Sequence, residues 1–334
     1  MKSYYVELTG IGESRLAEEE IDIEDLRDDE AVIQAEYSMI SAGTELSRAY
    51  GLKKGFSYPV RPGYCMTGRI VKKGKDIDAK EGDLVFVNAP HASLVRRSTS
   101  DKIQGPLIIR LPEGIDPIYA SAINLGLVAL QAVNLSKVRL GDSVAVFGLG
   151  NIGIFAALMY QKMGCRVIGV DPVEGRRRLA EDMGIEETAS DKEEVLKRCA
   201  GGVDIAVDVT GLSNVIIDCV AVCRPYGQAV LLGSPRQSYE TDVTPFLSAV
   251  HMKDIRILGA FNQTVPVYPA EGSDDSMMRN FHVVCGLFMR KDIDVRKMVS
   301  RVIDPKDCQK AYHDLMYEKE NTGLIVYDWR KYQE

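Results

Sequence analysis

The sequence has no concentration of basic residues and few of the side chains that build metal or disulfide sites. Its 334 residues carry 41 Lys and Arg against 48 Asp and Glu, so the formal net charge is −7. The absence of a basic stretch argues against nucleic acid and against an anionic membrane surface as partners. There are four histidines, and the seven cysteines include no CxxC pair. We therefore expect reduced, mostly buried thiols rather than a disulfide framework.

Long uninterrupted apolar runs are also missing. The longest apolar stretch, residues 144–160, is broken by three glycines and Asn151, and fits strand, turn and helix better than a membrane span. The opening MKSYYVELTG lacks a charged segment followed by an apolar one, so we expect a cytoplasmic protein with no membrane association. With 46% apolar residues the chain can bury a large core, and its length favours two domains.

Three sections of different character follow one another along the chain. Residues 1–112 show short alternating runs such as DLVFVNAP between Gly, Pro and charged turns, which predicts a small, mainly β domain. In residues 113–261, apolar strands such as SVAVFG and QAVLLGS alternate with helical patterns. This alternation predicts an α/β fold with βαβ units around a doubly wound parallel sheet. Residues 262–334 are expected to return to the first domain, because such a parallel core closes once its strands are used.

The most specific motif lies in the stretch SVAVFGLGNIGIFAALMYQKMGCRVIGVD. A strand runs into a glycine-rich turn, a helix follows, and a second strand ends at Asp171. The first glycine makes the tight turn, the second lets the backbone approach a pyrophosphate, and the third packs helix against strand, so that the phosphate lies on the amides of the helix N-terminus. The candidate cofactor-binding residues of this turn are Gly148, Gly150, Asn151, Ile152 and Gly153.

Asp171 bears on the choice between NAD and NADP. It is placed to accept hydrogen bonds from the adenosine ribose. A 2′-phosphate at ~4 Å would be repelled by roughly 1 to 4 kcal/mol at effective dielectric constants of 80 to 20, which favours NAD. Arg176, Arg177 and Arg178 support the alternative, since an arginine just past the strand can hold the 2′-phosphate of NADP. Otherwise they form a solvated helix face.

The carboxyl ends of three later strands add further candidate cofactor contacts. Ligands of open α/β sheets bind at that edge, although each position could equally be a plain strand terminus. The last two of these residues are expected near the carboxamide of the nicotinamide. The candidates are Thr210, Gly211, Gly233, Ser234, Ala260 and Phe261.

With a β domain first, a dinucleotide-binding domain from the second third, and the stretches GDLVFV and GDSVAVFGLGNIG, the chain resembles the medium-chain dehydrogenase/reductase superfamily of alcohol and polyol dehydrogenases. The resemblance implies a GroES-like β-barrel catalytic domain and a Rossmann domain, with the active site in the cleft between them. It also implies an oxidoreductase that uses NAD, acts on a small-molecule substrate, and assembles as a homodimer or homotetramer.

The chain lacks the zinc ligands that the best-known members of this superfamily carry. Alanine, Ala42, stands at the first ligand cysteine, and Tyr64 replaces the ligand histidine. The stretch SAINLGLVALQAV contains no Cys, His, Glu or Asp, and the four-cysteine lobe is missing between Asn88 and Leu107. Because zinc needs three or four converging ligands, the resemblance implies no metal. The stretches YSMISAGTE and RPGY resemble the zinc-less branch that includes bacteriochlorophyllide dehydrogenase-like proteins.

Without zinc, another group must polarise the substrate oxygen. Tyr64 is the first candidate, because its family-equivalent position faces the nicotinamide and a phenol can donate to a carbonyl or, once ionised, accept from an alcohol. The ordinary phenol pKa of about 10 would have to be lowered by the nicotinamide cation before Tyr64 served as a base. Its alternative role is to shape the pocket. Thr44 matches a family hydroxyl that bonds the reacting oxygen, or else it caps the next helix.

Two further groups complete the catalytic candidates. Glu45 is expected to pair with an arginine such as Arg48 or Arg69, or to act as a base. His91, on a loop of the first domain, is a candidate acid–base group. Cys65 is expected to be a small buried side chain, with lining of the substrate pocket as the alternative.

The function these residues favour is metal-independent, NAD-dependent hydride transfer between the nicotinamide and a secondary alcohol or ketone. Sugars, cyclitols and other polyhydroxy compounds are the candidate substrates. One alternative is a zinc-less quinone or enone reductase, but such reductases tend to use NADPH, so Asp171 counts against it. Another is a dinucleotide-binding protein without turnover.

Overall fold

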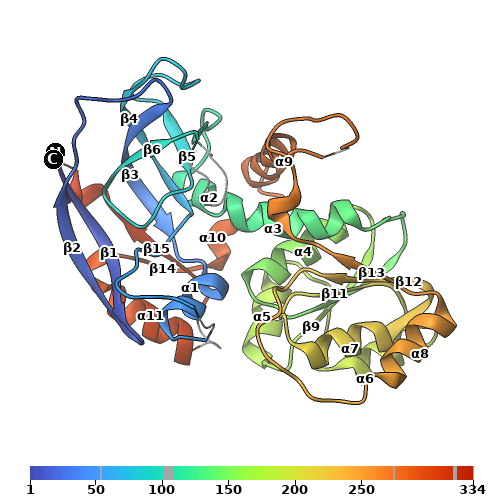
Figure 1. The fold of residues 1–334 in the computed structure, drawn as a ribbon. Coiled ribbons are helices and arrows are strands. Elements are labelled where there is room, and N and C mark those ends of the chain that lie inside the picture. The colour runs from blue at the N-terminus through green and yellow to red at the C-terminus, as the bar shows by residue number, and fades with distance from the viewer. Residues whose placement is uncertain (53–54, 101–107, 274, 319–321, 334) are drawn as a thin grey trace. The chain divides into compact units, whose positions relative to one another are not determined.

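The chain divides into two compact units, which we call the first unit (Met1–Asn124 and Cys285–Glu334) and the second unit (Leu125–Val284). The computed structural model, drawn in Figure 1, describes residues 1–52, 55–100, 108–273, 275–318 and 322–333.

The chain passes between the units within two helices. It leaves the first unit in α3 (Ile123–Leu135) and re-enters it in α9 (Met277–Met289). The change of sequence pattern placed the boundaries earlier, at residues 112 and 261. The helical pattern continues across the actual boundaries, so it gives no local signal there.

The first unit is built on a seven-stranded mixed sheet in the order β14-β15-β3-β4-β5-β7, with β6 paired to β3. Its pairs are antiparallel except for the parallel pair β14 and β15. A separate hairpin precedes it. The strands of this unit are β1 (Lys2–Gly10), β2 (Glu13–Glu20), β3 (Glu30–Met39), β4 (Met66–Lys73), β5 (Leu84–Val87), β6 (Leu94–Ser98), β7 (Ile108–Arg110), β14 (Val299–Ile303) and β15 (Leu324–Asp328).

Short helices pack on this sheet. The eight-residue α1 buries Leu46 and Ala49 in the same core cluster as Ile33 of β3 and Trp329 after β15. The N-terminal and C-terminal segments of the chain therefore share one hydrophobic core. The helices of this unit are α1 (Ala42–Ala49), α2 (Pro117–Ser121), α10 (Val295–Met298) and α11 (Cys308–Tyr317), with short 3-10 turns η2 (Pro305–Asp307) and η3 (Arg330–Tyr332).

The second unit contains a six-stranded parallel sheet in the order β10-β9-β8-β11-β12-β13. In chain order this is 3-2-1-4-5-6, the doubly wound Rossmann arrangement, whose direction reverses between β8 and β11. The predicted α/β fold class is confirmed. The strands are β8 (Ser143–Phe147), β9 (Arg166–Val170), β10 (Glu187–Ala189), β11 (Val203–Asp208), β12 (Cys223–Leu231) and β13 (Arg256–Gly259).

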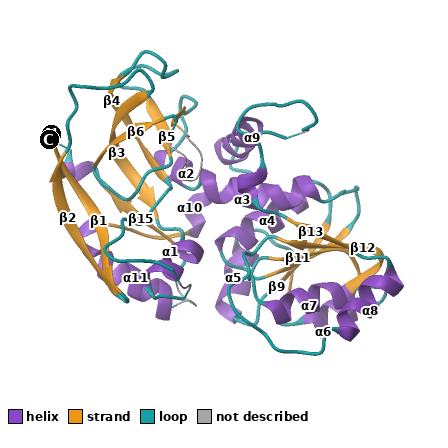
Figure 2. Cartoon of the chain, viewed as in Figure 1, coloured by secondary structure: helices purple, strands orange, loops and turns teal. Residues whose placement is uncertain are grey.

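Helices lie around these strands (Figure 2). The central strands carry near-continuous apolar runs because helices contact them: α4 contacts β8 and β9, and α7 contacts β11 and β12. Such crossovers bring the carboxyl ends of all six strands to one edge of the sheet. The remaining elements are α4 (Asn151–Lys162), α5 (Glu174–Asp182), α6 (Lys192–Arg198), α7 (Ser213–Val222), α8 (Thr244–Lys253) and the 3-10 turn η1 (Asn262–Thr264).

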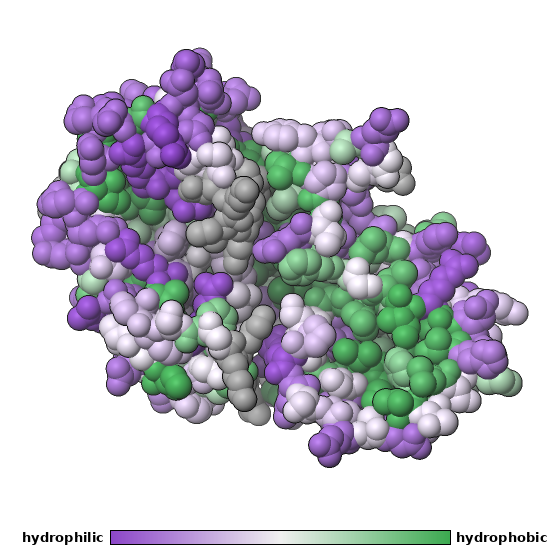
Figure 3. Space-filling model, in the orientation of Figure 1, coloured by the Kyte–Doolittle hydropathy of each residue, from purple (hydrophilic) through white to green (hydrophobic). Residues whose placement is uncertain are grey.

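Apolar side chains also gather on the face of the second unit that is visible in Figure 3. The exposed apolar residues of this unit include Leu247 and Met252 on α8 and Ile257 on the edge strand β13. All seven cysteines are free, and all except Cys199 are buried. Within the described part of the chain, no helix has both the length and the apolar character that a membrane crossing requires.

Candidate functional site

The glycine-rich turn after β8 requires glycine at two positions for steric reasons. Gly148 has φ +98°, and its N–H donates to the Val170 carbonyl at 2.7 Å. A Cβ on Gly153 would lie 1.8 Å from the Gly148 carbonyl oxygen. The first and third glycines of the motif therefore bring α4 against β8 as closely as two backbones can approach.

The second glycine leaves an open helix N-terminus. Gly150 is the N-cap of α4, no side chain caps the helix there, and a Cβ at this position would meet nothing within 4 Å. The first turn, which contains Asn151 and Ile152, carries no acidic residue. Unsatisfied amides and the positive end of the helix dipole face this open space. The turn thus fits the pyrophosphate of a dinucleotide.

Asp171 directly follows β9 and lies against the same turn. Its side chain is buried, and its two carboxylate oxygens accept the backbone N–H groups of Leu149 and Val173, both at 2.9 Å. The oxygen that accepts from Leu149 also lies 3.4 Å from an Arg176 guanidinium nitrogen. Each carboxylate oxygen can accept about two hydrogen bonds, so the oxygen bonded to Val173 has further acceptor capacity. The side chain is only 3% exposed, however, so it must become more accessible before it can bind a ribose hydroxyl.

The three arginines of α5 do not act alike. Arg176 pairs with the Asp171 carboxylate, and Arg177 donates to the Asp171 carbonyl at 2.7 Å. Arg178 pairs with Glu174 on the exposed helix surface. The expected solvated face describes only Arg178, because the first two arginines turn back onto the end of β9.

Two further loops at the carboxyl edge touch the turn or each other. A Cβ on Gly148 would lie 2.8 Å from the Thr210 side chain, and a Cβ on Gly211 would lie 2.1 Å from the Ser234 carbonyl oxygen. A Cβ on Gly233 would lie 2.3 Å from the Gly211 nitrogen. These four predicted residues are therefore brought together with the glycine-rich turn.

Asp208, which the sequence reasoning missed, organises this loop. It is buried, and its carboxylate accepts the Thr210 N–H and hydroxyl at 2.9 and 2.6 Å and the Gly211 N–H at 3.0 Å. Burial raises the pKa of this carboxyl, while those hydrogen bonds oppose the rise. The stretch DVTG carried the signal, since Asp often bonds the backbone two residues on.

Ala260 and Phe261 follow the carboxyl end of the edge strand β13. The Ala260 N–H donates to the Leu231 carbonyl at 3.0 Å, and this residue is buried. Phe261 is 57% exposed. Both lie at the same edge of the sheet as the other cofactor candidates, with the Phe261 ring open to solvent.

A cluster of three hydroxyl groups lies in the first unit. The Tyr64 hydroxyl donates to the Ser41 hydroxyl through a short hydrogen bond and lies 3.3 Å from the Thr44 hydroxyl. Ser41 is the N-cap of α1, but its side chain does not cap the helix. Tyr64 is half-buried and Thr44 is exposed. The sequence predicted Tyr64 and Thr44 but missed Ser41, although a serine directly before a helix marks a cap position.

Behind this cluster, Glu45 and His91 form a buried pair. Glu45 is 1% exposed, and its two oxygens accept the Ser41 N–H at 2.7 Å and the Tyr312 hydroxyl at 2.6 Å. His91 Nε2 lies 3.0 Å from the Glu45 oxygen that Tyr312 bonds, and the imidazole has no exposed surface.

The hydrogen bonds continue beyond His91 and fix its tautomer. The Trp329 indole N–H donates to the Ser38 hydroxyl at 2.8 Å, and that hydroxyl lies 2.7 Å from His91 Nδ1. Indole is a donor only, so the Ser38 proton is free to bond Nδ1, and Nε2–H then donates to the Glu45 carboxylate. With this arrangement each polar group from Trp329 to Glu45 has a hydrogen-bond partner.

The backbone before Tyr64 is shaped around this histidine. Gly63 has φ +103°, and a Cβ there would lie 2.7 Å from the His91 backbone nitrogen. The Pro62 carbonyl accepts the His91 N–H at 2.9 Å. The PGY turn is therefore held against the His91 backbone, and this contact positions Tyr64, the last residue of the turn.

The expected pairing of Glu45 with an arginine is wrong. Arg69 instead pairs with Glu36 at 2.8 Å, and Arg48 stacks over the Phe56 ring. Glu45 points from α1 into the core, where the Ser41 N–H, the His91 imidazole and the Tyr312 hydroxyl surround it. His91 and Glu45 are also too deeply buried to touch a substrate in this structure.

Burial raises the pKa of Tyr64, and the neighbouring Cys65 adds to the rise, while the hydrogen bonds to Ser41 and Thr44 oppose it. Tyr64 is therefore a neutral phenol here, able to donate a proton but not to accept one. Burial likewise raises the pKa of the Cys65 thiol well above its usual value, and this side chain has no exposed surface. Cys65 fills core space rather than a pocket.

The residues at the expected zinc position do not suit the metal. Ala42 offers no ligand atom, and the Tyr64 hydroxyl is bonded to Ser41. Over the described ranges, three or more His, Cys, Asp or Glu side chains nowhere form a group that could hold a metal ion. This donor set falls short of the three or four ligands that zinc requires.

Residues 151–273 match the zinc-binding dehydrogenase family. Alcohol dehydrogenase 1 of Trifolium repens is 29% identical over 220 residues, which cover 63% of this chain and 53% of that protein. The (R,R)-butanediol dehydrogenase of Bacillus subtilis is 26% identical over 202 residues, covering 52% and 58%. The chain thus spans little more than half the length of the curated relatives it matches.

Solved structures share the fold over nearly the whole chain. The 2R,3R-butanediol dehydrogenase of Bacillus subtilis superposes with a TM-score of 0.80 at 19% identity, covering 98% of this chain and 99% of that one. A Sinorhizobium meliloti protein bound to NADP gives 0.79 at 18%, and an alcohol dehydrogenase of E. coli CFT073 complexed with NADH gives 0.80 at 14%, each with the same coverage. The comparisons support the resemblance to alcohol dehydrogenase-like proteins.

Proposed function

We propose that this chain, which the comparisons relate to the zinc-binding dehydrogenase family, is a dehydrogenase that works without zinc. It would move a hydride between NAD and a secondary alcohol or ketone. The observation that carries the proposal is the cluster of Tyr64, Ser41 and Thr44 hydroxyls, which occupies the sequence positions where the resemblance expects metal ligands and their neighbours.

The cofactor, when bound, supplies or accepts the hydride. The open N-terminus of α4 at Gly150 would hold its pyrophosphate, and the free acceptor site on Asp171 would bind a ribose hydroxyl. The loops at Thr210 and Gly233 line the same carboxyl edge of the sheet. Gly150 leaves open space for the pyrophosphate, whereas the ribose contact would require the buried Asp171 carboxylate to become accessible, for instance by a shift of the Arg176 side chain.

Tyr64 would exchange the proton that accompanies the hydride. As a neutral phenol it can donate to the oxygen of a carbonyl substrate, and the phenolate left behind would accept hydrogen bonds from the Ser41 and Thr44 hydroxyls. Those two bonds favour the ionised form and so lower the cost of the transfer. For alcohol oxidation the same groups would act in reverse, starting from the phenolate.

Glu45 and His91 would serve as positioning residues. The carboxylate holds the Ser41 backbone amide, and Ser41 in turn holds the Tyr64 hydroxyl. His91 fixes the carboxylate and supports the turn that carries Tyr64. This assigns the two buried candidates to the geometry of the hydroxyl cluster and leaves the proton transfer to Tyr64.

NAD is the proposed cofactor because a carboxylate ends β9. For NADP to bind, the 2′-phosphate would have to draw Arg176 away from Asp171, leaving the carboxylate without its cation. The likeness to a butanediol dehydrogenase makes diols and other polyhydroxy compounds the first substrates to test.

A substrate panel tests the proposal. Purified protein is assayed with secondary alcohols, diols and sugars, and with ketones, quinones and enones, each with both cofactors and in the presence of a chelator. We expect turnover of an alcohol–ketone pair with NAD(H). Reduction of quinones or enones only, with NADPH, would replace this proposal, and cofactor binding without any turnover would refute catalysis.

A further inference from the structure

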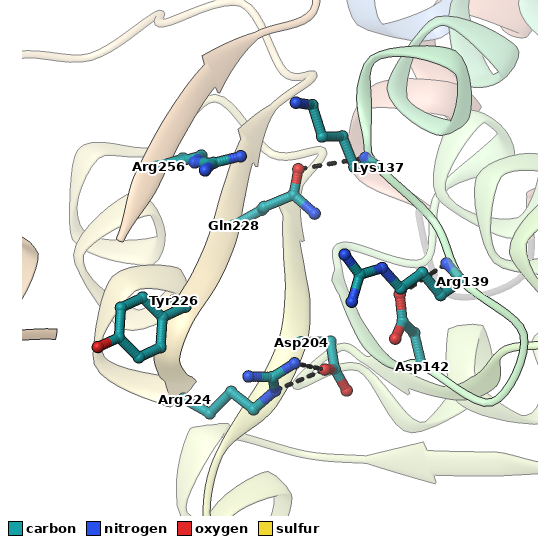
Figure 4. A pocket seen from close by; sticks show the side chains of 8 residues that line it. All are labelled: Lys137, Arg139, Asp142, Asp204, Arg224, Tyr226, Gln228 and Arg256. Atoms are coloured by element: carbon teal, nitrogen blue, oxygen red, sulfur yellow. Dashed lines mark hydrogen bonds and ion pairs between the residues drawn. The ribbon is translucent and has the colours of Figure 1, made fainter. Parts of the chain in front are cut away.

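A pocket lies at the edge of the parallel sheet where the strands begin, opposite the edge that carries the glycine-rich turn. Figure 4 shows the side chains that line it. It is lined where β8, β11, β12 and β13 begin, and by the loop after α3. The glycine-rich turn follows the carboxyl end of β8, so the length of this five-residue strand, ~16 Å, separates the two places. A ligand in this pocket would therefore not be the dinucleotide itself.

The pocket carries an excess of positive charge. Its lining includes four cationic side chains and two carboxylates. Both carboxylates already have donors: Asp204 accepts from Arg224 and from Ser143, and Asp142 accepts the Arg139 N–H at 2.8 Å. Of the four cationic side chains, these two carboxylates therefore pair with one, the Arg224 guanidinium.

Three cationic groups remain without an acidic partner. The side chains of Lys137, Arg139 and Arg256 make no ion pair or hydrogen bond with any residue that the structure describes. In Figure 4, Lys137 and Arg256 extend toward each other over Gln228, and Arg139 reaches toward the same space. All three side chains are exposed, so water screens their mutual repulsion, and an anion bound between them would be attracted by each.

Gln228 adds a neutral hydrogen-bonding group to the lining of the pocket. It is 9% exposed, and its carbonyl oxygen accepts the Lys137 N–H at 3.2 Å. Its amide nitrogen has no partner among the described residues, and the side chain lines the pocket (Figure 4). This amide faces the pocket, where it can donate to a hydrogen-bond acceptor bound there.

Tyr226, at the rim of the pocket, adds a strained backbone. Its φ is +64°, a conformation that L residues other than Asn and Asp rarely adopt, and its ring is 73% exposed. The turn presents an aromatic surface next to the cations. An organic group attached to an anion can pack against such a ring.

We propose that this pocket binds a small phosphomonoester. The guanidinium groups of Arg139 and Arg256 and the Lys137 ammonium would hold the phosphate oxygens, with the Gln228 amide as a fourth donor. The cavity of about 250 Å³ accommodates a phosphate on a small organic group. The proposal does not depend on the proposed dehydrogenase activity.

Calorimetric titration of the whole protein with phenyl phosphate and with inorganic phosphate tests the site. We expect phenyl phosphate to bind with a Kd of about 1 mM or below, and inorganic phosphate more weakly. Replacing both cations, Lys137→Gln with Arg256→Gln, should weaken phenyl phosphate binding by about 10-fold or more, because two charge-assisted hydrogen bonds to the phosphate are lost. The preference for phenyl phosphate should shrink in Tyr226→Gly.

A matched variant separates a site from general charge attraction. Lys72→Gln with Lys75→Gln removes two cations from surface ion pairs of the first unit, so the net charge changes equally. This variant should bind phenyl phosphate as the unmodified protein does. Equal weakening in both double variants, displacement of phenyl phosphate by NADH, or no binding at about 10 mM would each overturn the proposal.

Discussion

The two candidate regions, the glycine-rich turn and the cluster around Tyr64, are built from different chemical groups. The properties of the turn after β8 come from its backbone. Because Gly148, Gly150 and Gly153 have no Cβ atom, the turn keeps an open space, accessible amides and a close contact with the helix. The cluster around Tyr64 is made of side chains, in which hydroxyls, a carboxylate and an imidazole satisfy one another. The first region lies within one short segment, whereas the second assembles segments from both ends of the chain.

This difference sets how each region should respond to mutation. A backbone site is damaged by an added methyl group, because space is the functional property. A side-chain network is damaged by a removed atom, because each donor or acceptor left behind is buried without a partner. The predictions below separate the two kinds of damage.

The largest effect is expected for Tyr64→Phe, which removes only the hydroxyl. Positioned proton transfer contributes roughly 10²- to 10⁴-fold, so kcat should fall by that order while NADH affinity stays unchanged. Ser41→Ala should reproduce a smaller part of the loss. Steady-state kinetics and NADH fluorescence titration measure the two quantities, and a Tyr64→Phe variant within about threefold of the parent kcat would show that Tyr64 only shapes the site.

The pH dependence follows from the raised pKa of Tyr64. Ketone reduction needs the phenol and should be flat between about pH 6 and 9, whereas alcohol oxidation needs the phenolate and should rise with pH. The rising limb should disappear in Tyr64→Phe.

The next effect is on stability, in the buried network. Glu45→Gln keeps the shape of the side chain but removes the charge that His91 and Tyr312 bond, so the free energy of unfolding should fall by about 2–5 kcal/mol. Glu24, which pairs with Lys72 at the surface, is the matched control, and Glu24→Gln should cost less than about 1 kcal/mol. Equal losses in urea unfolding would remove the distinction between network and surface pair.

The glycine-rich turn offers a contrast between two alanine substitutions. Gly153→Ala places a methyl group against the Gly148 carbonyl and should lower the melting temperature, because the helix cannot pack. Gly150→Ala meets nothing in the free protein, so it should leave the melting temperature unchanged but weaken NADH binding by about 10- to 100-fold, an overpacking cost of about 1–3 kcal/mol. If Gly150→Ala binds NADH normally, the pyrophosphate lies elsewhere.

The smallest effect is expected at the cofactor's ribose. Arg176→Ala removes the cation beside Asp171 without disturbing the amides that this carboxylate accepts. Loss of about 1 kcal/mol of attraction should widen the preference for NADH over NADPH about fivefold. Arg178→Ala, which breaks only a surface pair, should leave the ratio of the two dissociation constants unchanged.

The same contrast explains how much could be predicted from sequence. The α/β fold class follows from local patterns: glycine spacing, apolar strands and their alternation with helices. Tyr64 was predicted only through its position in a resembling motif. Its partner Ser41 lies 23 positions earlier in the chain, and Glu45 meets Tyr312 across 267 positions. No local pattern records such pairings, so the sequence suggested an arginine partner for Glu45 where the fold supplies His91 and Tyr312.

The boundaries between the units and the basic pocket were missed for a related reason. The chain crosses between the units inside continuous helices, which show no break in pattern. Lys137, Arg139 and Arg256 lie on two different segments and look like ordinary surface charges until the parallel sheet aligns the beginnings of its strands.

The central claim is that the Tyr64 hydroxyl cluster takes the place of a metal. Elemental analysis of the purified protein, combined with the alcohol or ketone assay before and after exhaustive chelation, tests it most directly. We predict less than about a tenth of an equivalent of zinc and unchanged activity after chelation, because the ligand set is incomplete. Stoichiometric zinc whose removal abolishes activity, and whose return restores it, would contradict the claim.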